Sequence, residues 1–310
     1  MPTREALDLL DRYNQAIADQ EAQTVARLNR ALDAAYRDLE RELRATYPAI
    51  ASNDTLLATQ RKTLIVEQLG ETLSVVSESD ADYYQQSLTD TLATANQTGR
   101  TLADELVLAI APGSGVPELG NINLEAAALQ ARDGFQRLRR YSDEFKDRAS
   151  AVIEQGLIQG WGPAKVADIL REQLKVTKSK AETLARTETL SALNDAAQQR
   201  YAQNGIEHVQ WICTIGDVCK FCVARNAQVY PVGKVRVPCH PRCRCVLLPY
   251  RKSWADLGLT DEATIEDYHR DRLSDLTKAG LKPDGGLTPF ERAAGLTTPP
   301  TPVWSPGNKE

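Results

Sequence analysis

All six cysteines of the chain lie in one short stretch, from Cys213 to Cys245, and this clustering constrains the fold more than any other feature. A secreted protein held together by disulfides spreads its cysteines through a small chain. The rest of this 310-residue chain contains none. The clustering therefore favours a local metal site, with disulfides and free thiols as the alternatives.

The spacing within the cluster is typical of a zinc site. Cys219 and Cys222 form a CxxC turn that directs two thiolates at one ion, and the later segment His240-Pro-Arg-Cys243-Arg-Cys245 brings further donors. Zinc takes four such ligands in a tetrahedron. We predict a structural zinc ion held by four of five residues: Cys219 and Cys222 first, then Cys243, with His240 or Cys245 as the fourth.

Two features argue against catalysis at this cluster. The only acidic residues close to it in sequence are Glu207 and Asp217, and Asp217 follows a glycine in a predicted turn. A nucleophile formed by Cys243 or Cys245 with His208 would compete with metal chelation for the thiolate. We therefore predict no catalytic residues and no enzymatic activity.

Charge is distributed unevenly along the chain. The net charge is −5, but residues 201–252 hold eight Lys or Arg and two acidic residues, a local +6 that leaves −11 for the remainder. A basic patch of this kind attracts phosphates. The residues predicted to contact DNA are Lys220, Arg225, Lys234, Arg236, Arg242 and Arg244. The sequence has no run of about 18 apolar residues, so no membrane span is expected, and its start lacks the pattern of a secretory signal.

The first half of the chain reads as helix. Apolar residues from Leu10 to Leu43 recur in steps of three and four, which predicts one long amphipathic helix that Tyr47-Pro48 ends. Further helices are predicted over 54–69 and 81–111. We interpret this region as the wall of a helical bundle, with a coiled-coil docking arm as the alternative.

The second half changes from helices to short strands. Four helical patterns follow a loop at 112–117: 124–141, one capped by Ser142 and closed by Gly160, one opened by Pro163, and one capped by Thr177 or Ser179 and ended by Gly205. Alternation predicts strands at 209–213, 229–230 and 246–248, with Cys213 packing as a small hydrophobe. A helix at 261–279 precedes a Pro/Gly-rich tail that we expect to be extended or mobile.

Polar residues on the helix before the cluster suggest structural links. Glu188 falls on an apolar stripe, where an unpaired carboxylate is expensive to bury, so we predict a buried polar link from this helix to the sheet. Arg186 faces another side and can pair with Glu182 one turn earlier. Asn194 and Asp217 complete the predicted set of structural polar residues.

These residues occur in a recognisable order. The set is Ala185-Arg186-Thr187-Glu188-Thr189, Asn194, Tyr201, Gly205-Ile206, Trp211, Asp217, Cys219-x-x-Cys222 and His240-Pro-x-Cys243-Arg-Cys245, then Pro249. It resembles the phage Mu protein F-like head morphogenesis family, also called minor head or minor capsid proteins, over about residues 140–250. One departure is Arg225-Asn226-Ala227, where many relatives have a glycine, although Asn226 can adopt left-handed geometry.

The resemblance implies a structural protein of a tailed phage or prophage. Such proteins bind the portal protein or the major capsid protein, are built into the head in few copies, and in some cases act on the fate of packaged DNA during packaging or ejection. It implies a place in the virion, in the head interior or at the portal vertex, after assembly in the host cytoplasm. Neither a membrane nor a small-molecule substrate is expected.

We predict an α+β chain: a long, mainly helical N-terminal region, then a helical and small-sheet domain with a zinc-knuckle-like Cys/His cluster. The alternatives are a zinc-dependent nuclease or other DNA-acting enzyme, and a soluble zinc-binding regulator. The predicted segments are a helical region (1–111), a linker (112–122), the head-morphogenesis domain (123–252), a helical extension (253–280) and the tail (281–310).

Overall fold

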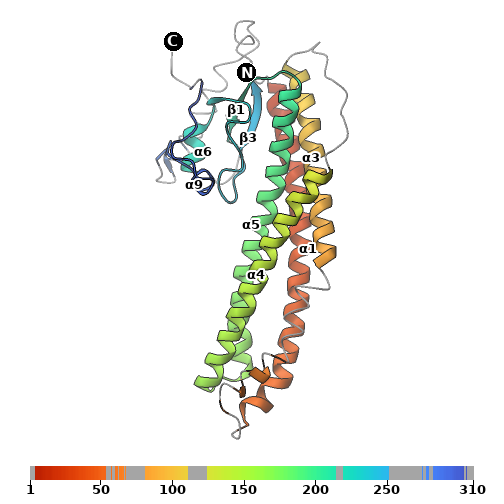
Figure 1. Cartoon of the computed structure of the whole chain (residues 1–310), viewed down its shortest axis with the longest axis vertical. Helices are drawn as coiled ribbons and strands as arrows, with labels where there is room; N and C mark the ends of the chain where they lie inside the picture. Colours follow the sequence, from red (N-terminus) through yellow and green to blue (C-terminus); the bar gives the residue numbers. More distant parts are fainter. Residues whose placement is uncertain are drawn as a thin grey trace. The chain divides into compact units, whose positions relative to one another are not determined.

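The α+β class is confirmed by the computed structural model, which describes residues 4–53, 81–110, 124–213, 219–250 and 282–303, with single positions between 57 and 67, between 274 and 278, and at 305. The elements are α1 (Arg4–Ala51), α3 (Ala81–Ile110), α4 (Leu124–Gln159), α5 (Pro163–Gln203), β1 (His208–Ile212), α6 (Lys220–Arg225), β2 (Val229–Pro231), β3 (Val246–Tyr250) and α9 (Pro289–Ala293) (Figure 1). None of the described helices is long and apolar enough to cross a membrane.

Helix α1 continues for one turn beyond its predicted end, because its proline lies where the helix can still tolerate it. Pro48 has no N–H to donate to the preceding turn, but its carbonyl still accepts. The backbone N–H of Ser52 donates to that carbonyl over 3.1 Å, and the Ser52 hydroxyl donates to it over 2.8 Å. These bonds extend α1 to Ala51.

Helices α4 and α5 are each continuous, where the sequence predicted two pairs of shorter helices. Ser142 lies inside α4 rather than at a start, and Thr177 lies inside α5. The Thr177 hydroxyl donates to the carbonyl of Gln173 one turn earlier, so it serves the helix interior instead of capping a new one. Pro163 opens α5 as predicted, and Gly205 follows it with a positive φ of 70°.

The chain divides into two compact units, each built from segments that are far apart in the sequence. Residues 1–20, 91–127 and 186–310 form one, which we call the sheet unit, and residues 21–90 and 128–185 form the other, which we call the helical unit. The predicted segment boundaries, which follow chain order, stay a prediction. The predicted linker at 112–122 and most of the predicted helices at 54–69 and 261–279 lie outside the described residues.

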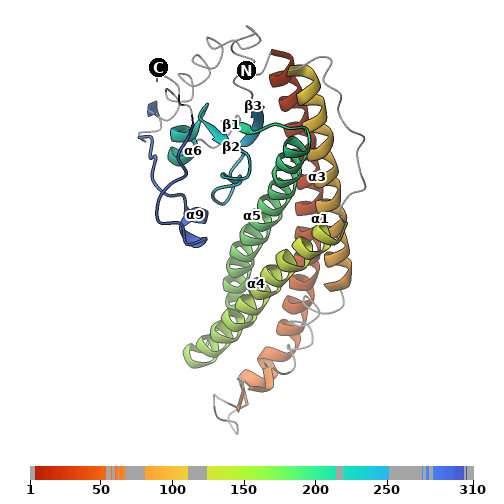
Figure 2. The same cartoon turned by 45° about the horizontal axis from the view of Figure 1, so that its top comes forward.

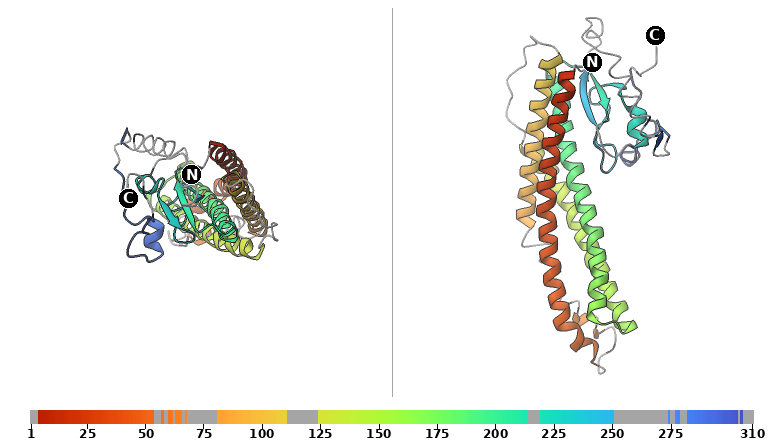
Figure 3. Two further views of the ribbon diagram at one scale, coloured as in Figure 1. Left: turned by 90° about the horizontal axis from the view of Figure 1, so that it is seen from above. Right: turned by 180° about the vertical axis from the view of Figure 1, so that it is seen from behind.

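The helical unit is held by contacts between α1, α4 and α5 (Figure 3). The Tyr36 hydroxyl donates to the Ala167 carbonyl over 2.7 Å, and Lys178 pairs with Asp33. The buried apolar residues of this unit include Leu39, Leu43, Tyr47, Phe145, Ile153, Val166 and Leu170. Leu39 and Leu43 belong to the predicted apolar stripe of α1, and Tyr47 lies just beyond it, so this stripe faces the core of a helical bundle.

The sheet unit places its three antiparallel strands beside the C-terminal part of α5, in the order β2-β1-β3 (Figure 2). Trp211 in the central strand pairs with Leu247 of β3 and is fully buried. Gln210, on the other face of β1, is also buried, and its side-chain amide donates to the Ala227 carbonyl over 2.9 Å. Both faces of β1 are therefore covered, and the three predicted strands are confirmed.

The described part of the tail packs on the sheet unit, and the expectation of an extended tail is wrong for Pro289–Ala293, which form the short helix α9. Thr288 and Glu291 form a capping box that starts α9. The Val303 N–H donates to the Val229 carbonyl of edge strand β2 over 2.8 Å. The tail has too few apolar residues to form a core of its own. These hydrogen bonds attach it to the sheet unit, which has a core already.

Gly99 marks a close approach between α3 and α5. A Cβ built on Gly99 would lie 2.2 Å from the backbone oxygen of Leu193. We expect Gly99→Ala to lower the free energy of unfolding by about 1–3 kcal/mol through overpacking, despite the better helix propensity of alanine. Urea unfolding of the full chain would measure it, with Gly162→Ala as the control because a Cβ there meets open space. An unchanged unfolding midpoint for Gly99→Ala would contradict the close approach.

Candidate metal centre

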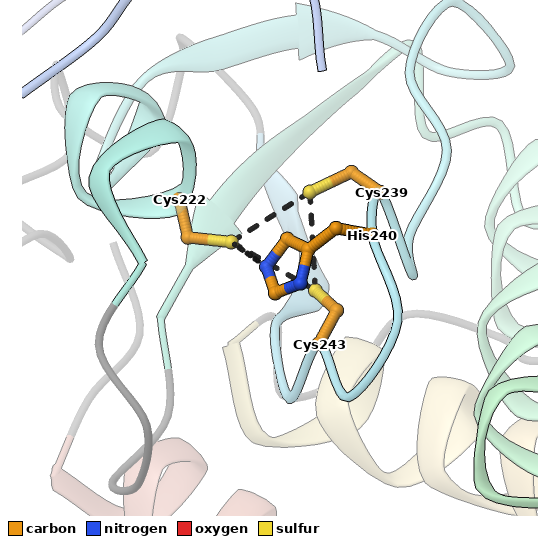
Figure 4. A group of neighbouring side chains, drawn as sticks. All are labelled: Cys222, Cys239, His240 and Cys243. Atoms are coloured by element: carbon orange, nitrogen blue, oxygen red, sulfur yellow. Dashed lines mark hydrogen bonds between the residues drawn. The ribbon is translucent and has the colours of Figure 1, made fainter. Parts of the chain in front are cut away.

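Four side chains of the cluster converge on one point. The sulfur atoms of Cys222, Cys239 and Cys243 and a ring nitrogen of His240 all lie within 4.8 Å of one another, and their side chains point inward (Figure 4). Three of the four residues are buried and His240 is half-buried. Thiolates and imidazole are metal ligands, so this group can hold a metal ion.

The distances between the donor atoms fit a tetrahedron. Metal–sulfur bonds of about 2.3 Å give sulfur–sulfur edges of about 3.8 Å around a tetrahedral ion. The Cys222 sulfur lies 3.6 Å from that of Cys239 and 3.8 Å from that of Cys243, and Cys239 lies 3.9 Å from Cys243. The Cys222 sulfur is 3.0 Å from Nε2 of His240. Little movement is needed to close the four donors on an ion.

Two short elements carry these ligands. Cys222 lies in the single turn of α6, and the other three come from the loop before β3. The Cys243 N–H donates to the His240 carbonyl over 3.2 Å, and the intervening Arg242 has a positive φ of 63°, which folds the loop tightly enough to direct both side chains inward. The Phe290 N–H of α9 donates to the Cys239 carbonyl over 3.3 Å and fixes the start of this loop.

The thiols and the imidazole of the cluster shift one another's pKa, as expected for side chains close enough to bind one cation. Hydrogen bonds from Cys222 and other thiols lower the pKa of Cys243 well below its ordinary value. Burial lowers the pKa of His240, but hydrogen bonds with the thiols of Cys219 and Cys243 raise it more, to about 10. Protons therefore take the positions between thiolates that a metal ion would otherwise occupy, and metal binding would release them.

The ligand group differs in part from the predicted set. Cys222, His240 and Cys243 are in it, whereas Cys239 stands in place of Cys219 and Cys245. Cys219 is half-buried beside the group, where a hydrogen bond from Cys222 lowers its pKa to about 4. Cys239 was not in the predicted set, although it directly precedes His240; adjacent residues point apart in an extended chain. In this irregular loop both face the same point.

Cys245 instead lies next to Cys213. The two sulfur atoms are 3.6 Å apart and both residues are buried. The backbone N–H of Cys213 donates to Oδ1 of Asn226 over 2.8 Å, which fixes the end of β1. Asn226 has an ordinary negative φ, and Ala227 adopts the left-handed conformation (φ 64°) that the sequence assigned to Asn226. The Asn226 side chain is thus used as a hydrogen-bond acceptor.

A buried polar link joins α5 to the sheet, but it is made by Asn194. The Asn194 side chain donates to the Leu190 carbonyl over 3.0 Å and accepts from the Leu247 N–H over 3.3 Å. The Tyr201 hydroxyl donates to the Leu247 carbonyl over 3.2 Å. Both residues are almost completely buried. Asn194 belongs to the predicted set of structural polar residues, although the sequence assigned the link to Glu188.

The other predicted polar residues have separate positions. Glu188 is buried at 7% exposure and takes part in a polar or electrostatic interaction. Arg186 is half-buried on α5. Its predicted partner Glu182 instead accepts a hydrogen bond from the Asn29 side chain over 2.8 Å. Asp217 lies outside the described residues.

The six predicted DNA-contacting residues do not form one free surface. Arg225 is 2% exposed and forms an ion pair with Glu291 over 3.0 Å, so the prediction is wrong for this residue. Lys220 pairs with Asp284 over 2.9 Å, and Arg236 pairs with Asp195 over 2.8 Å. Lys234 and Arg242 are exposed and Arg244 is half-buried.

The fold separates His208 from the thiols. His208 begins β1, whereas Cys213 follows the last residue of that strand. At about 3.3 Å per residue the backbone from 208 to 213 spans about 16 Å. A general base at His208 therefore cannot reach a nucleophile on Cys243 or Cys245.

Scans against models of protein families, against curated proteins and against solved structures find no match to this chain.

Proposed function

We propose that the chain is a minor head protein of a tailed phage or prophage, with a structural rather than a catalytic role. The observation that carries the proposal is where the residues of the resemblance lie. Asn194 and Tyr201 attach α5 to β3, Trp211 is fully buried in β1, and Cys222 and His240 converge on the metal site. These residues hold one unit together, which favours an assembly protein over an enzyme.

We propose zinc as the metal of this site. Three thiolates and one imidazole in a tetrahedron are a set that zinc favours, whereas calcium and magnesium require oxygen ligands. All four positions are supplied by the protein, so a bound zinc ion would stabilise the fold and keep no position for substrate. In the sheet unit it would connect α6 to the loop before β3.

The proposed partners are the portal protein and the inner face of the capsid. Outside residues 201–252 the chain is acidic, with a net charge of −11, and we propose that its helical regions there dock to these partners. Mass spectrometry of purified virions and a pull-down with the portal protein test this directly. Presence in virions and retention on the portal support it, whereas a protein absent from both, and recovered only in the soluble fraction, would favour a zinc-binding regulator.

Contact with packaged DNA is proposed for Lys234 and Arg242, which are exposed, and for Arg244, which is half-buried. We expect the full chain to bind duplex DNA at low salt, with an affinity that falls steeply as salt rises because phosphate contacts release counterions. A triple substitution of these residues to glutamine is expected to weaken binding, whereas Arg41→Gln, an exposed arginine of α1, serves as the matched control. Equal binding by both variants would remove the DNA contact from the proposal.

The same preparation tests the enzymatic alternative. Incubation with DNA and divalent metal ions is expected to leave the DNA intact. Cleavage that His208→Ala abolishes would overturn the structural role and favour a nuclease.

A further inference from the structure

The described part of the tail is attached to both elements that carry the metal ligands. On α6, which holds Cys222, the Asp284 N–H donates to the Lys220 carbonyl over 3.1 Å, and the Asp284 carboxylate pairs with the Lys220 ammonium over 2.9 Å. On the loop before β3, the Phe290 N–H donates to the Cys239 carbonyl over 3.3 Å. The tail and the four donors therefore connect the same two elements.

A buried ion pair makes a further attachment, between α9 of the tail and the end of α6 (Figure 1). The Glu291 carboxylate lies 3.0 Å from the Arg225 guanidinium, and the two side chains are 15% and 3% exposed. The same guanidinium nitrogen, Nη2, donates to the Gly286 carbonyl over 2.9 Å. A buried charge is costly without its partner, so the buried position of Arg225 depends on the docked tail.

Helix α6 needs such attachments because it is a single turn. It has six residues, and its N-cap, Cys219, makes no side-chain capping hydrogen bond. A helix this short is not stable by itself. Beyond its end, the Ala227 N–H donates to the Trp211 carbonyl over 2.7 Å and fixes the chain to β1. Within the turn, a metal ion at Cys222 and the tail at Arg225 would act together on its position.

We propose that metal binding and docking of the tail are coupled, so that residues 284–303 stay docked while the ion is bound and are released when it is lost. The bound ion fixes α6 against the loop before β3, which holds Lys220, Arg225 and Cys239 where the tail contacts them. Without the ion α6 can move outward, and Arg225 then reaches water, where an ion pair with Glu291 contributes little. The inference rests on the proposed metal site.

The coupling is reciprocal by thermodynamic necessity. If the ion holds the tail in place, the docked tail raises the affinity for the ion by the same factor. Glu291 binds no metal itself, but through Arg225 it acts on the turn that carries Cys222. It is therefore a positioning residue of the metal site, 66 residues from Arg225 along the chain.

Glu291→Gln tests this reciprocity in the full chain. Glutamine serves at the third position of a capping box as glutamate does, so the substitution removes the charge that faces Arg225 and keeps the start of α9. We expect the affinity for zinc, measured by competition with a chelating dye, to fall about tenfold or more. Glu172→Gln, which alters an exposed pair with Lys175 on α5, is the matched control and is expected to bind zinc as the wild type does. An unchanged affinity of Glu291→Gln would overturn the coupling.

Amide hydrogen exchange of the wild-type chain, with zinc and after its removal by a chelator, measures release of the tail directly. The N–H groups of Asp284, Phe290 and Val303 donate to α6, to the loop before β3 and to β2. We expect peptides from 284–303 to exchange about tenfold faster or more without zinc. Peptides from β1 are expected to keep their protection.

The other outcomes of the exchange experiment are distinguishable. Zinc binding without a change in the exchange of the tail would overturn the coupling and leave the metal site intact. An equal loss of protection in β1 would overturn it too, because the whole sheet unit would then unfold when the ion is lost. A chain that binds no zinc would overturn the proposed metal site as well.

Discussion

Replacing Cys222 with serine is expected to release the bound metal and to lower the melting temperature of the chain by about 10 °C or more. Cys222 is the member of the four-donor group whose sulfur lies close to all three other donors. A serine hydroxyl is a much poorer ligand for zinc than the cysteine thiolate that it replaces. The loss of metal removes the connection between α6 and the loop before β3, because binding free energy at a structural site is folding free energy.

Cys219→Ser is the matched control for this experiment. Its thiol belongs to the same CxxC turn, but it is half-buried and lies outside the four-donor group. We expect its metal content and melting temperature to stay close to those of the wild type. Metal analysis together with thermal unfolding, with and without a chelator, measures both quantities. Loss of metal from Cys219→Ser but not from Cys222→Ser would show that Cys219 is the ligand and would contradict the geometry.

Asp104→Ala is expected to lower the free energy of unfolding by about 3–5 kcal/mol, the usual cost of removing one partner of a buried ion pair. Nε of Arg200 lies 2.5 Å from Oδ1 of Asp104, and their side chains are 3% and 12% exposed. Asn204 also donates to the same carboxylate oxygen, over 3.1 Å. The substitution would leave the Arg200 guanidinium buried without its carboxylate, between α3 and α5.

Two further variants separate a lost ion pair from a simple packing defect. The double variant Asp104→Leu with Arg200→Met is expected to recover most of the loss, since neither charge remains buried. Asp38→Ala breaks an exposed pair with Arg41 and is expected to cost less than about 1 kcal/mol. Urea unfolding measures all of them. A loss in Asp104→Ala no larger than in Asp38→Ala would show that the buried pair has little energetic importance.

Local patterns predicted the elements of this fold well. Period-three-and-four stripes predicted the long helices, and alternation around Trp211 predicted the central strand. Pro163 was recognised as a helix start and Gly205 as a helix end, because a proline ring and a positive φ are properties of single residues. The interruptions predicted at Ser142 and Thr177 were wrong, since a hydroxyl can bond to the preceding turn as readily as it caps a new helix.

The candidate site was predictable in its chemistry and its region but not in its membership. The clustering and spacing indicated a metal site, yet Cys239 was missed and Cys219, which lies outside the four donors, was placed first with Cys222. Cys245 was one of two candidates for the fourth ligand, and the structure has the other, His240. Which thiols share an ion depends on how a loop folds against a strand over tens of residues, and spacing carries no information on that. The burial of Arg225 could not be predicted from the sequence either, because its partner Glu291 lies in the tail, 66 residues further along the chain.

The class of fold, the places where helix changes to strand, and a Cys/His cluster in a basic segment of an acidic chain could all be inferred from the order of the residues. These follow from side-chain size, charge and backbone preference, which act over a few residues. Only the tertiary structure decided that Asn194 links α5 to β3, that Cys239 completes the four donors, and that Cys213 meets Cys245. Such pairings depend on strand register and loop closure, which set which distant atoms come within bonding distance.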